Sequence, residues 1–394
     1  MGGVNSHPFL PLGSPCRFRL LLTVIKSLVY SVDLKLLHIR FMAYDIISEI
    51  GFGAPIGFVD KGADIGGLIQ GFHDGLPYIG LMARLHPFTT WIKTTWIGQR
   101  YLVARPEHKS GIGVLMRFRD RLLAQRMQEI EEGKKIDRVD LLQTFIDART
   151  DDGKPLDMDY IKAEILLVLL AGAETTGTSF QTLLCYIMSN SDVYDRLMIE
   201  IDDATRKGLL SPIPQFSEVR DHCPYYIACM RESMRVCPSV PTTFPRVVSE
   251  PGMDLYGKFA PAGTEIACNS WQVHRDKTIY GEDADSFRPE RWLEDEEKEK
   301  LYAKYSLVFG YGPRICLGKD IALMELYKGP LQVDAPNSND RFWFRTAQVL
   351  TYSRPSSRKF KPEIVDKNNP GEFVILGGIG HWKNMWITLS ERPE

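Results

Sequence analysis

The sequence Phe309-Gly310-Tyr311-Gly312-Pro313-Arg314-Ile315-Cys316-Leu317-Gly318 carries more information about the fold than any other stretch of the chain. Its glycines permit a tight loop whose backbone passes close to Cys316, with N–H groups free to point at the sulfur. The residues that follow, Lys319 to Leu326, are strongly helical. Cys316 is therefore expected at a helix N-terminus, where the helix dipole stabilises a thiolate.

A single thiolate in a glycine loop suits a haem iron with one protein ligand, whereas zinc and iron–sulfur sites need three or four ligands. Arg314 favours this reading because a guanidinium group can pair with an anionic cofactor. A buried structural cysteine beside a glycine turn remains the alternative from these residues alone.

The composition around this stretch is that of an ordinary globular protein. The 394 residues include 48 Lys+Arg and 50 Asp+Glu, and 44% are hydrophobic, which argues against a disordered, collagen-like or coiled-coil chain. A net charge of −2 gives no electrostatic reason to expect nucleic acid as a partner. The seven cysteines are an odd, scattered set, which favours a reducing compartment over a disulfide framework.

No segment qualifies as a membrane span. The most apolar N-terminal stretch, residues 20–30, has about half the ~20 residues that a spanning helix needs, and Lys26 interrupts it. No small-residue cleavage site follows it, so a signal peptide is not predicted. Residues 1–6 match the myristoylation pattern, which arises often by chance.

Helical periodicity dominates the first 330 residues. Apolar spacing predicts helices over residues 115–130, 140–147, 159–190 and 225–237. Residues 259–268 and 371–377 have strand and turn chemistry. The expected fold class is therefore mainly α with a small β component, and the centre of the 159–190 helix is apolar enough to be buried.

That long helix contains the second motif, Ala171-Gly172-Ala173-Glu174-Thr175-Thr176. An acid and a hydroxyl in a buried apolar helix are costly unless they have a use. Gly172 is expected to thin the helix so that something flat can approach, and Thr175 can bond back to the Ala171 carbonyl. Glu174 and Thr175 could then relay protons to a ligand; a structural buried Glu174 is the alternative.

The third motif is Glu232-Ser233-Met234-Arg235, in which Glu232 and Arg235 share a helix face and can pair. Arg291, in the downstream Pro289-Glu290-Arg291, could complete a triad. A buried network of this kind contributes structural specificity more than stability. Alone, Glu-x-x-Arg is a weak signal.

The order and spacing of these motifs resemble the cytochrome P450 superfamily, in its microsomal-type fungal form. Two segments between them, Tyr256-Gly257-Lys258-Phe259 and Val273-His274-Arg275-Asp276, also look like this family, as does Phe244-Pro245-Arg246. The likeness covers residues 41–324 and resumes near residue 360. It implies the cytochrome P450 fold with its N-terminal part missing.

Carried onto this sequence, the resemblance implies that Cys316 is the axial thiolate ligand of a haem b iron, where it favours O–O cleavage. It implies that Glu174 and Thr175 are the acid–alcohol pair that delivers protons to bound oxygen. The resemblance also implies further positions that bind the cofactor: Arg314, Arg246, Phe309, Gly312 and Gly318. It implies that the structural triad supporting the cofactor loop consists of Glu232, Arg235 and Arg291.

Two departures from the family pattern stand out. Residues 1–40 resemble nothing in the family, whose members begin with a membrane anchor, a proline-rich hinge and a sheet, so residues 41–394 are expected to form a partial catalytic domain. Residues 333–357 form an aperiodic insert, which is unusual in a compact domain. We hypothesise that this insert is translated intron, since Val codons begin with GT and Leu350-Thr351 could encode a branch point; uninterrupted reads through these codons in mature transcript would contradict this.

The resemblance implies a monomeric haem-thiolate monooxygenase that inserts one atom of O2 into an apolar small molecule, in fungal secondary metabolism or xenobiotic oxidation. NADPH-cytochrome P450 reductase would be its electron donor. The endoplasmic reticulum membrane is the location expected for the family, but the sequence shows no transmembrane anchor, so a cytoplasm-facing or soluble protein stays open as the alternative. Two alternatives stay open. One is a non-catalytic remnant unable to hold haem; the other is a haem enzyme that uses peroxide or isomerises an oxidised substrate.

Overall fold

The computed structural model of the chain describes residues 32–35, 37–134, 140–211, 214–328 and 360–391. The fold is mainly helical with small antiparallel sheets, which confirms the predicted fold class. The aperiodic insert over residues 333–357 and residues 1–31 lie outside the described residues.

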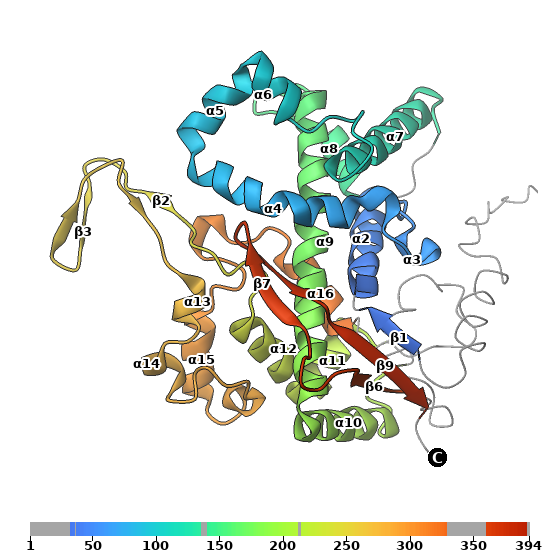
Figure 1. The fold of residues 1–394 in the computed structure, drawn as a ribbon, viewed down its shortest axis with the longest axis vertical. Helices are drawn as coiled ribbons and strands as arrows, with labels where there is room; N and C mark the ends of the chain where they lie inside the picture. Colours follow the sequence, from blue (N-terminus) through green and yellow to red (C-terminus); the bar gives the residue numbers. More distant parts are fainter. Residues whose placement is uncertain (1–31, 36, 135–139, 212–213, 329–359, 392–394) are drawn as a thin grey trace, which may run out of the picture.

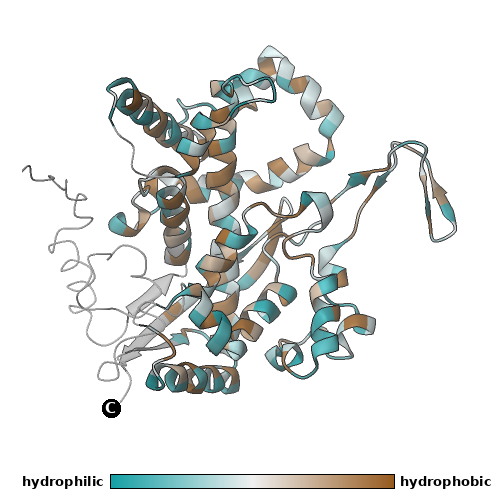
Figure 2. Ribbon diagram, turned by 180° about the vertical axis from the view of Figure 1, so that it is seen from behind, coloured by the Kyte–Doolittle hydropathy of each residue, from teal (hydrophilic) through white to brown (hydrophobic). Residues whose placement is uncertain are grey.

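The central element is α9 (Met158–Ser189), around which the other helices are arranged (Figure 1). Its 32 residues span ~48 Å, as predicted for residues 159–190. The Asp157 side chain caps the helix by accepting hydrogen bonds from the amides of Asp159 and Tyr160. Hydrophobic residues lie along much of α9 and of neighbouring α2 (Leu37–Phe52), as Figure 2 shows from behind.

Two glycines of α9 allow α2 to pack closely. A Cβ atom on Gly172 would lie 2.8 Å from Ile47 Cγ1, and one on Gly177 would lie 3.1 Å from Arg40 Cγ. The expectation that Gly172 makes room for a flat ligand is therefore wrong. The space beside Gly172 is taken by a side chain of α2, because two helices this close leave no room for a Cβ at the contact.

Two apolar clusters flank α9 and share its side chains. One joins α2, α7 (Ile112–Glu131) and the first half of α9 around Phe41, Leu115 and Ile165. The other joins the second half of α9 to α10 (Ser191–Arg206) and α12 (Pro224–Val236) around Phe180 and Tyr226. Since α9 contributes to both, it holds the two parts of the core together.

The remaining helices largely follow the predicted periodicity. The helices predicted over residues 115–130, 140–147 and 225–237 appear as α7, α8 and α12, shifted by a few residues at most. The bounds, in chain order, are α3 (Phe58–Lys61), η1 (Ile65–Gly67), α4 (Leu68–Arg84), α5 (His86–Thr94), α6 (Trp96–Tyr101), α7 (Ile112–Glu131), α8 (Leu141–Asp147), α10 (Ser191–Arg206), α11 (Phe216–His222), α12 (Pro224–Val236), α13 (Ser270–Val273), α14 (Lys277–Tyr280), η2 (Pro289–Trp292), α15 (Glu296–Tyr305), η3 (Gly312–Arg314) and α16 (Lys319–Lys328).

Within the described residues, the strands form one three-stranded sheet, in the order β1-β9-β6, and three two-stranded sheets, β2-β5, β3-β4 and β7-β8. All the pairs are antiparallel. The bounds are β1 (Val32–Lys35), β2 (Arg246–Val247), β3 (Met253–Leu255), β4 (Lys258–Ala260), β5 (Glu265–Ile266), β6 (Phe360–Ile364), β7 (Glu372–Leu376), β8 (Ile379–Lys383) and β9 (Trp386–Glu391). The predicted strand and turn segments at 259–268 and 371–377 are thereby confirmed.

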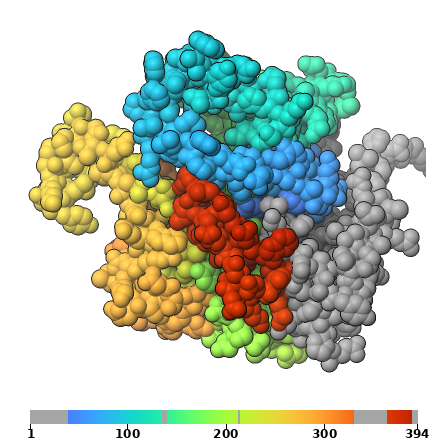
Figure 3. Space-filling view, in the orientation of Figure 1, coloured from blue at the N-terminus to red at the C-terminus, as the bar shows by residue number. Residues whose placement is uncertain are grey.

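The C-terminal strands lie across one face of the molecule, directly below α4, while the β3-β4 hairpin projects away from the body (Figure 3). The hairpin exposes Met253, Tyr256 and Phe259. In the part of the chain that the structure describes, no helix has both the length and the apolar composition needed to cross a bilayer.

Candidate active site

The loop that carries Cys316 is closed by its own backbone. The Cys316 amide donates to the Phe309 carbonyl at 2.8 Å, and the Gly310 amide donates to the Leu307 carbonyl at 3.0 Å. Gly310 (φ 74°) and Gly312 (φ 67°) occupy the left-handed region that disfavours side chains. α16 begins three residues after Cys316, at Lys319, close to the predicted helix N-terminus.

The Cys316 side chain is exposed, in contrast to Cys185, Cys223, Cys229 and Cys237, which are buried. Its neighbours Ile315 and Leu317 are exposed apolar residues, and Leu317 is fully accessible. A Cβ atom on Gly312 would meet nothing within 4 Å, so the loop has open space beside it. An accessible thiol with apolar neighbours and open space fits a large apolar macrocycle whose metal takes one sulfur ligand.

The two arginines predicted to pair with an anionic cofactor are both exposed. Arg314 ends η3, two residues before Cys316. Arg246 lies on β2, and its Nη1 donates to the Pro245 carbonyl at 2.9 Å. Neither guanidinium group has a carboxylate partner among the described residues, so both are available to an anionic group.

The three triad residues come together in one buried network. Arg235, on α12, donates through Nε and Nη2 to the two oxygens of Glu232, each at 2.8 Å. Arg291, in η2, donates to Glu232 Oε1 at 2.9 Å, and Trp292 Nε1 donates to Oε2, also at 2.9 Å. All three charged side chains are at most 2% exposed. A carboxylate that accepts from two guanidinium groups and an indole is a fully paired buried charge.

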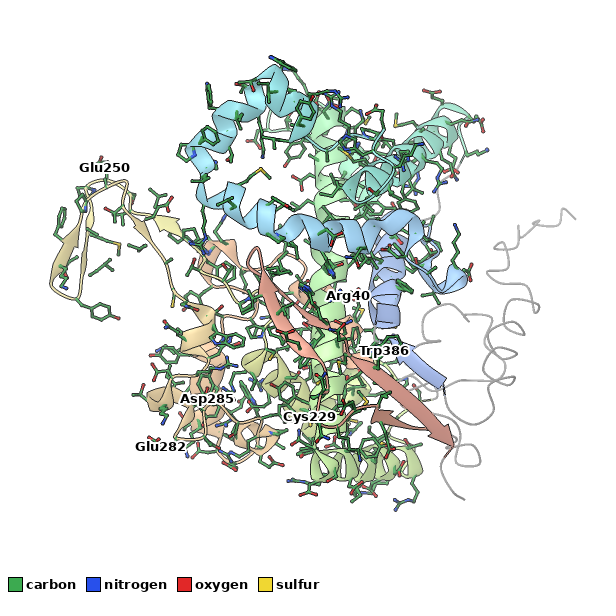
Figure 4. The ribbon with its side chains drawn as sticks, viewed as in Figure 1. Arg40, Cys229, Glu250, Glu282, Asp285 and Trp386 are labelled. Atoms are coloured by element: carbon green, nitrogen blue, oxygen red, sulfur yellow. The ribbon has the colours of Figure 1, made fainter. Side chains whose placement is uncertain are left out.

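Glu174 lies in a second buried network, on the side of α9 that faces α2 and α4. Tyr44 donates to its Oε1 at 2.9 Å, and His73 Nε2 lies 2.9 Å from its Oε2. Since an ionised carboxylate only accepts, His73 Nε2 is the donor, and its Nδ1 can accept from Arg40 Nη1 at 3.2 Å. Figure 4 labels Arg40 beside α9, where α2 packs.

This network sets the charge state of Glu174. Burial alone would raise the pKa of its carboxyl group, but the Arg40 guanidinium and the His73 and Tyr44 hydrogen bonds outweigh burial and lower the pKa. Burial raises the pKa of Tyr44, and the Glu174 charge raises it further. Glu174 is therefore ionised at neutral pH, although its side chain is only 1% exposed.

His381, on β8, closes the network from another side. Its ring stacks on His73 with the centroids 4.4 Å apart, and burial, together with the Arg40 charge, lowers its pKa to about 3. Sequence reasoning missed Arg40, Tyr44, His73 and His381 as neighbours of Glu174. They come from three separate elements and form no motif, so spacing gave no signal for them.

Thr175 is engaged elsewhere. Its hydroxyl donates to the Ala171 carbonyl at 2.7 Å, the back-bond that its position in the helix predicts. Thr175 is half-buried. Ala171 and Leu167, which lie one and two helical turns before it on the same face of α9, are exposed. The two side chains of the predicted acid–alcohol pair therefore bond to different groups: Glu174 to α2 and α4, and Thr175 to its own helix.

The aromatic residues over 72–96 divide between core and surface. Phe72 is buried, whereas Tyr78, Phe88, Trp91 and Trp96 are all more than half exposed. These exposed rings lie on α4, α5 and α6, which form the open arc at the top of Figure 1. Of these five aromatic residues, only Phe72 packs into the core.

Comparison with known proteins identifies the family. The model of the family described as cytochrome P450 matches residues 31–328. Quiannulatic acid synthase of Emericella variicolor is 33% identical over 361 residues, which cover 89% of this chain and 63% of that protein. Cytochrome P450 monooxygenase gsfF of Penicillium aethiopicum is 33% identical over 290 residues, 73% of this chain and 56% of that protein.

A third relative, cytochrome P450 monooxygenase cicH of Emericella nidulans, is 33% identical over 297 residues, with 74% of this chain and 57% of that protein covered. The chain thus spans between 56% and 63% of the length of these relatives. The match includes the glycine loop of Cys316, the triad and the central helix. The chain belongs to the cytochrome P450 family.

Proposed function

We propose that this chain is the catalytic part of a haem-thiolate monooxygenase that inserts one atom of O2 into an apolar small molecule in fungal secondary metabolism. Membership of the family implies a haem cofactor, and we propose haem b. The observation that carries the proposal is the exposed Cys316 thiol in a backbone-closed glycine loop at the start of α16.

In this proposal, Cys316 would hold the haem iron through its sulfur, and the backbone around Phe309, Gly312 and Gly318 would keep Cys316 in place. A bound haem would supply oxygen activation, which no side chain of the protein can provide by itself. Arg314 and Arg246 would pair with the propionates, since exposed guanidinium groups bind carboxylates in a bidentate manner. Glu232, Arg235 and Arg291 would keep the segment before the loop rigid.

Glu174 and Thr175 would manage protons. Glu174 is ionised in its network with Arg40, Tyr44 and His73, so in this arrangement it accepts hydrogen bonds and has no proton of its own to donate. Thr175 has its hydroxyl proton directed at the Ala171 carbonyl. A hydroxyl held in this way on the partly exposed side of α9 can accept a hydrogen bond from a group beside the helix.

The substrate proposed is apolar because the exposed side chains on the α9 face that carries Thr175, including Leu167 and Ala171, are apolar. NADPH-cytochrome P450 reductase is the proposed electron donor, with the protein acting as a monomer at the endoplasmic reticulum membrane. The relatives are named as monooxygenases of Penicillium and Emericella, which supports oxygen insertion over peroxide use or isomerisation.

The test is the spectrum of the reduced, haem-loaded chain with carbon monoxide. The long-wavelength Soret band characteristic of a thiolate ligand is expected, and Cys316→Ala should abolish it. Cys268→Ala is the matched control, because Cys268 is the other exposed cysteine among the described residues. A haem-loaded parent without the band would contradict the proposal, and failure to retain haem through gel filtration would support the non-catalytic remnant.

A further inference from the structure

His274 is a buried histidine whose ring has a specific partner in the Cys316 loop. It follows α13 directly and is completely inaccessible to solvent. Its Nε2 accepts a hydrogen bond from the Leu307 amide at 2.9 Å, across 33 positions of the chain. Leu307 is also the residue whose carbonyl accepts from Gly310, so this bond lies where the loop begins.

The backbone of the same residue is tied to the triad. Arg235, which pairs with Glu232, donates through Nη1 to the His274 carbonyl. A continuous path of hydrogen bonds thus runs from Glu232 through Arg235 and His274 to Leu307. Within the described part of the chain, the Leu307–His274 bond is the only hydrogen bond that joins residues 307–318 to another element outside α15 and α16.

The charge state of the ring supports this contact. Burial, followed by the charges of Arg235 and Arg275, lowers the pKa of His274 to about 4. The ring is therefore neutral at physiological pH, and a neutral imidazole with its proton on Nδ1 can accept at Nε2. An imidazolium could not accept this bond, because both of its nitrogens would be donors.

We infer that His274 is the positioning residue that couples the Glu232–Arg235–Arg291 network to the Cys316 loop, by holding the Leu307 amide. The competing possibility is that apolar packing of Val308 and Phe309 against the core positions the loop by itself. These two possibilities differ in what the side chain at position 274 must supply. In our inference it must supply a hydrogen-bond acceptor at the place of Nε2, whereas positioning by apolar packing alone needs no acceptor there.

Two amide substitutions separate these cases. In His274→Gln the side-chain oxygen can reach the place of Nε2, whereas in His274→Asn it is one methylene too short. Hydrogen exchange of the full chain without haem, followed by mass spectrometry, should show peptides that contain Leu307 exchanging about tenfold faster in His274→Asn. In His274→Gln their exchange should stay within about twofold of the parent.

The control is Ser48→Ala. Ser48 is also fully buried, and its hydroxyl accepts from one backbone amide, that of Ile56, at 3.1 Å. This variant loses the same kind of bond far along the chain from the loop. It should accelerate exchange at Ile56 and leave the Leu307 peptides unchanged.

Equal exchange of the Leu307 peptides in the Asn and Gln variants would overturn the inference. If the Asn variant fails to fold while the Gln variant folds, the acceptor at position 274 is needed and the inference stands. If both fail, an acceptor alone does not replace the ring and the inference is wrong.

A second measurement uses the haem-loaded chain and rests on the proposed function. Carbon monoxide complexes of reduced His274→Asn should contain a larger share of the short-wavelength, thiol-ligated form, and His274→Gln should restore the thiolate form. If the parent itself shows no thiolate band, the proposed function fails, while the exchange experiment still decides the role of His274.

Discussion

The imidazole Nε2 of His73 lies 2.9 Å from the Oε2 of Glu174, although 101 positions separate the two residues. This contact joins α4 to the centre of α9. Together with Tyr44 and Arg40 of α2, His73 covers the carboxylate, so that only 1% of the Glu174 side chain is exposed. A carboxylate held in this way is a buried, paired charge, and substitutions can measure what that charge contributes to stability.

Replacing Glu174 should cost stability well beyond the loss of one hydrogen bond. Glu174→Gln leaves the buried Arg40 without its counter-charge, and we expect a loss of about 3 kcal/mol in the free energy of unfolding at pH 7. Tyr44→Phe removes one donor to the ionised carboxylate and should cost about 2 kcal/mol. Urea unfolding measures both.

The control for Glu174→Gln is Glu282→Gln, which makes the same chemical change in an exposed ion pair. Glu282, which Figure 4 labels, pairs with Lys277. An exposed ion pair contributes little, so a change within about 0.5 kcal/mol is expected. Equal effects of the two substitutions would show that Glu174 carries no buried charge.

Arg235 should not tolerate lysine. Its guanidinium donates to both oxygens of Glu232 and to the backbone carbonyls of His274, Ala284 and Ser286. A lysine ammonium cannot reproduce this planar fork, so Arg235→Lys should cost about 3 kcal/mol or more, or prevent folding.

The comparison for Arg235→Lys is Arg196→Lys, since Arg196 pairs with Glu290 at 2.7 Å but is 56% exposed. This change should cost less than about 1 kcal/mol by thermal or urea unfolding. If the two lysine variants lose the same stability, the buried network contributes no more than an exposed pair.

The cysteines should divide sharply in reactivity. Burial raises the pKa of Cys185 and of Cys223 to about 12, and it also raises the pKa of Cys229 and Cys237, so these thiols should resist alkylation at pH 8. The exposed Cys316 should be alkylated rapidly. Peptide mass spectrometry after a short iodoacetamide pulse gives the order.

Loading with haem should protect Cys316 from this reagent, whereas the exposed Cys268 should stay reactive and serve as the internal control. Equal protection of the two thiols would point to a general change in the protein and against ligation by Cys316.

Glu325 should give the stability a measurable dependence on pH. Burial raises the pKa of its carboxyl group to about 8, so the folded protein keeps this proton where the unfolded chain has already lost it. Between the ordinary value of 4.5 and about 8, the unfolded state binds fewer protons, and stability therefore falls as the pH rises.

Glu325→Gln removes this titration. Its unfolding free energy relative to the parent should rise by more than about 1 kcal/mol between pH 5 and pH 8, as followed by urea unfolding at each pH. The exposed Glu282→Gln should show no such trend. A difference between Glu325→Gln and parent that stays constant over this range would mean that Glu325 is ionised in the folded protein.

Local patterns account for what could be predicted. The glycine loop, the pairing of Glu232 with Arg235 and the back-bond of Thr175 all join residues close in sequence, where helix geometry or a glycine's freedom sets the distance. Arg291 was added to the triad from its motif, and the structure brings it to Glu232. The central helix was predictable because its apolar stretch is too long for anything else.

Close packing between segments that are far apart in the chain could not be predicted from the sequence. Gly172 was expected to face a flat ligand, but it faces Ile47, because the approach of α2 is decided by the shapes of both helices. The hydrogen-bond and ion-pair partners of Glu174 could not be predicted either, because no sequence spacing links Arg40, Tyr44 and His73 to position 174.

The sequence by itself determined the family, the mainly helical fold and the residues that we propose for the chemistry, because these depend on periodicity and on short motifs. The tertiary structure alone decided how those residues are charged and held. Glu174 is an ionised, sealed carboxylate and His274 a neutral acceptor for Leu307 only because packing removes water and brings specific partners within hydrogen-bonding distance.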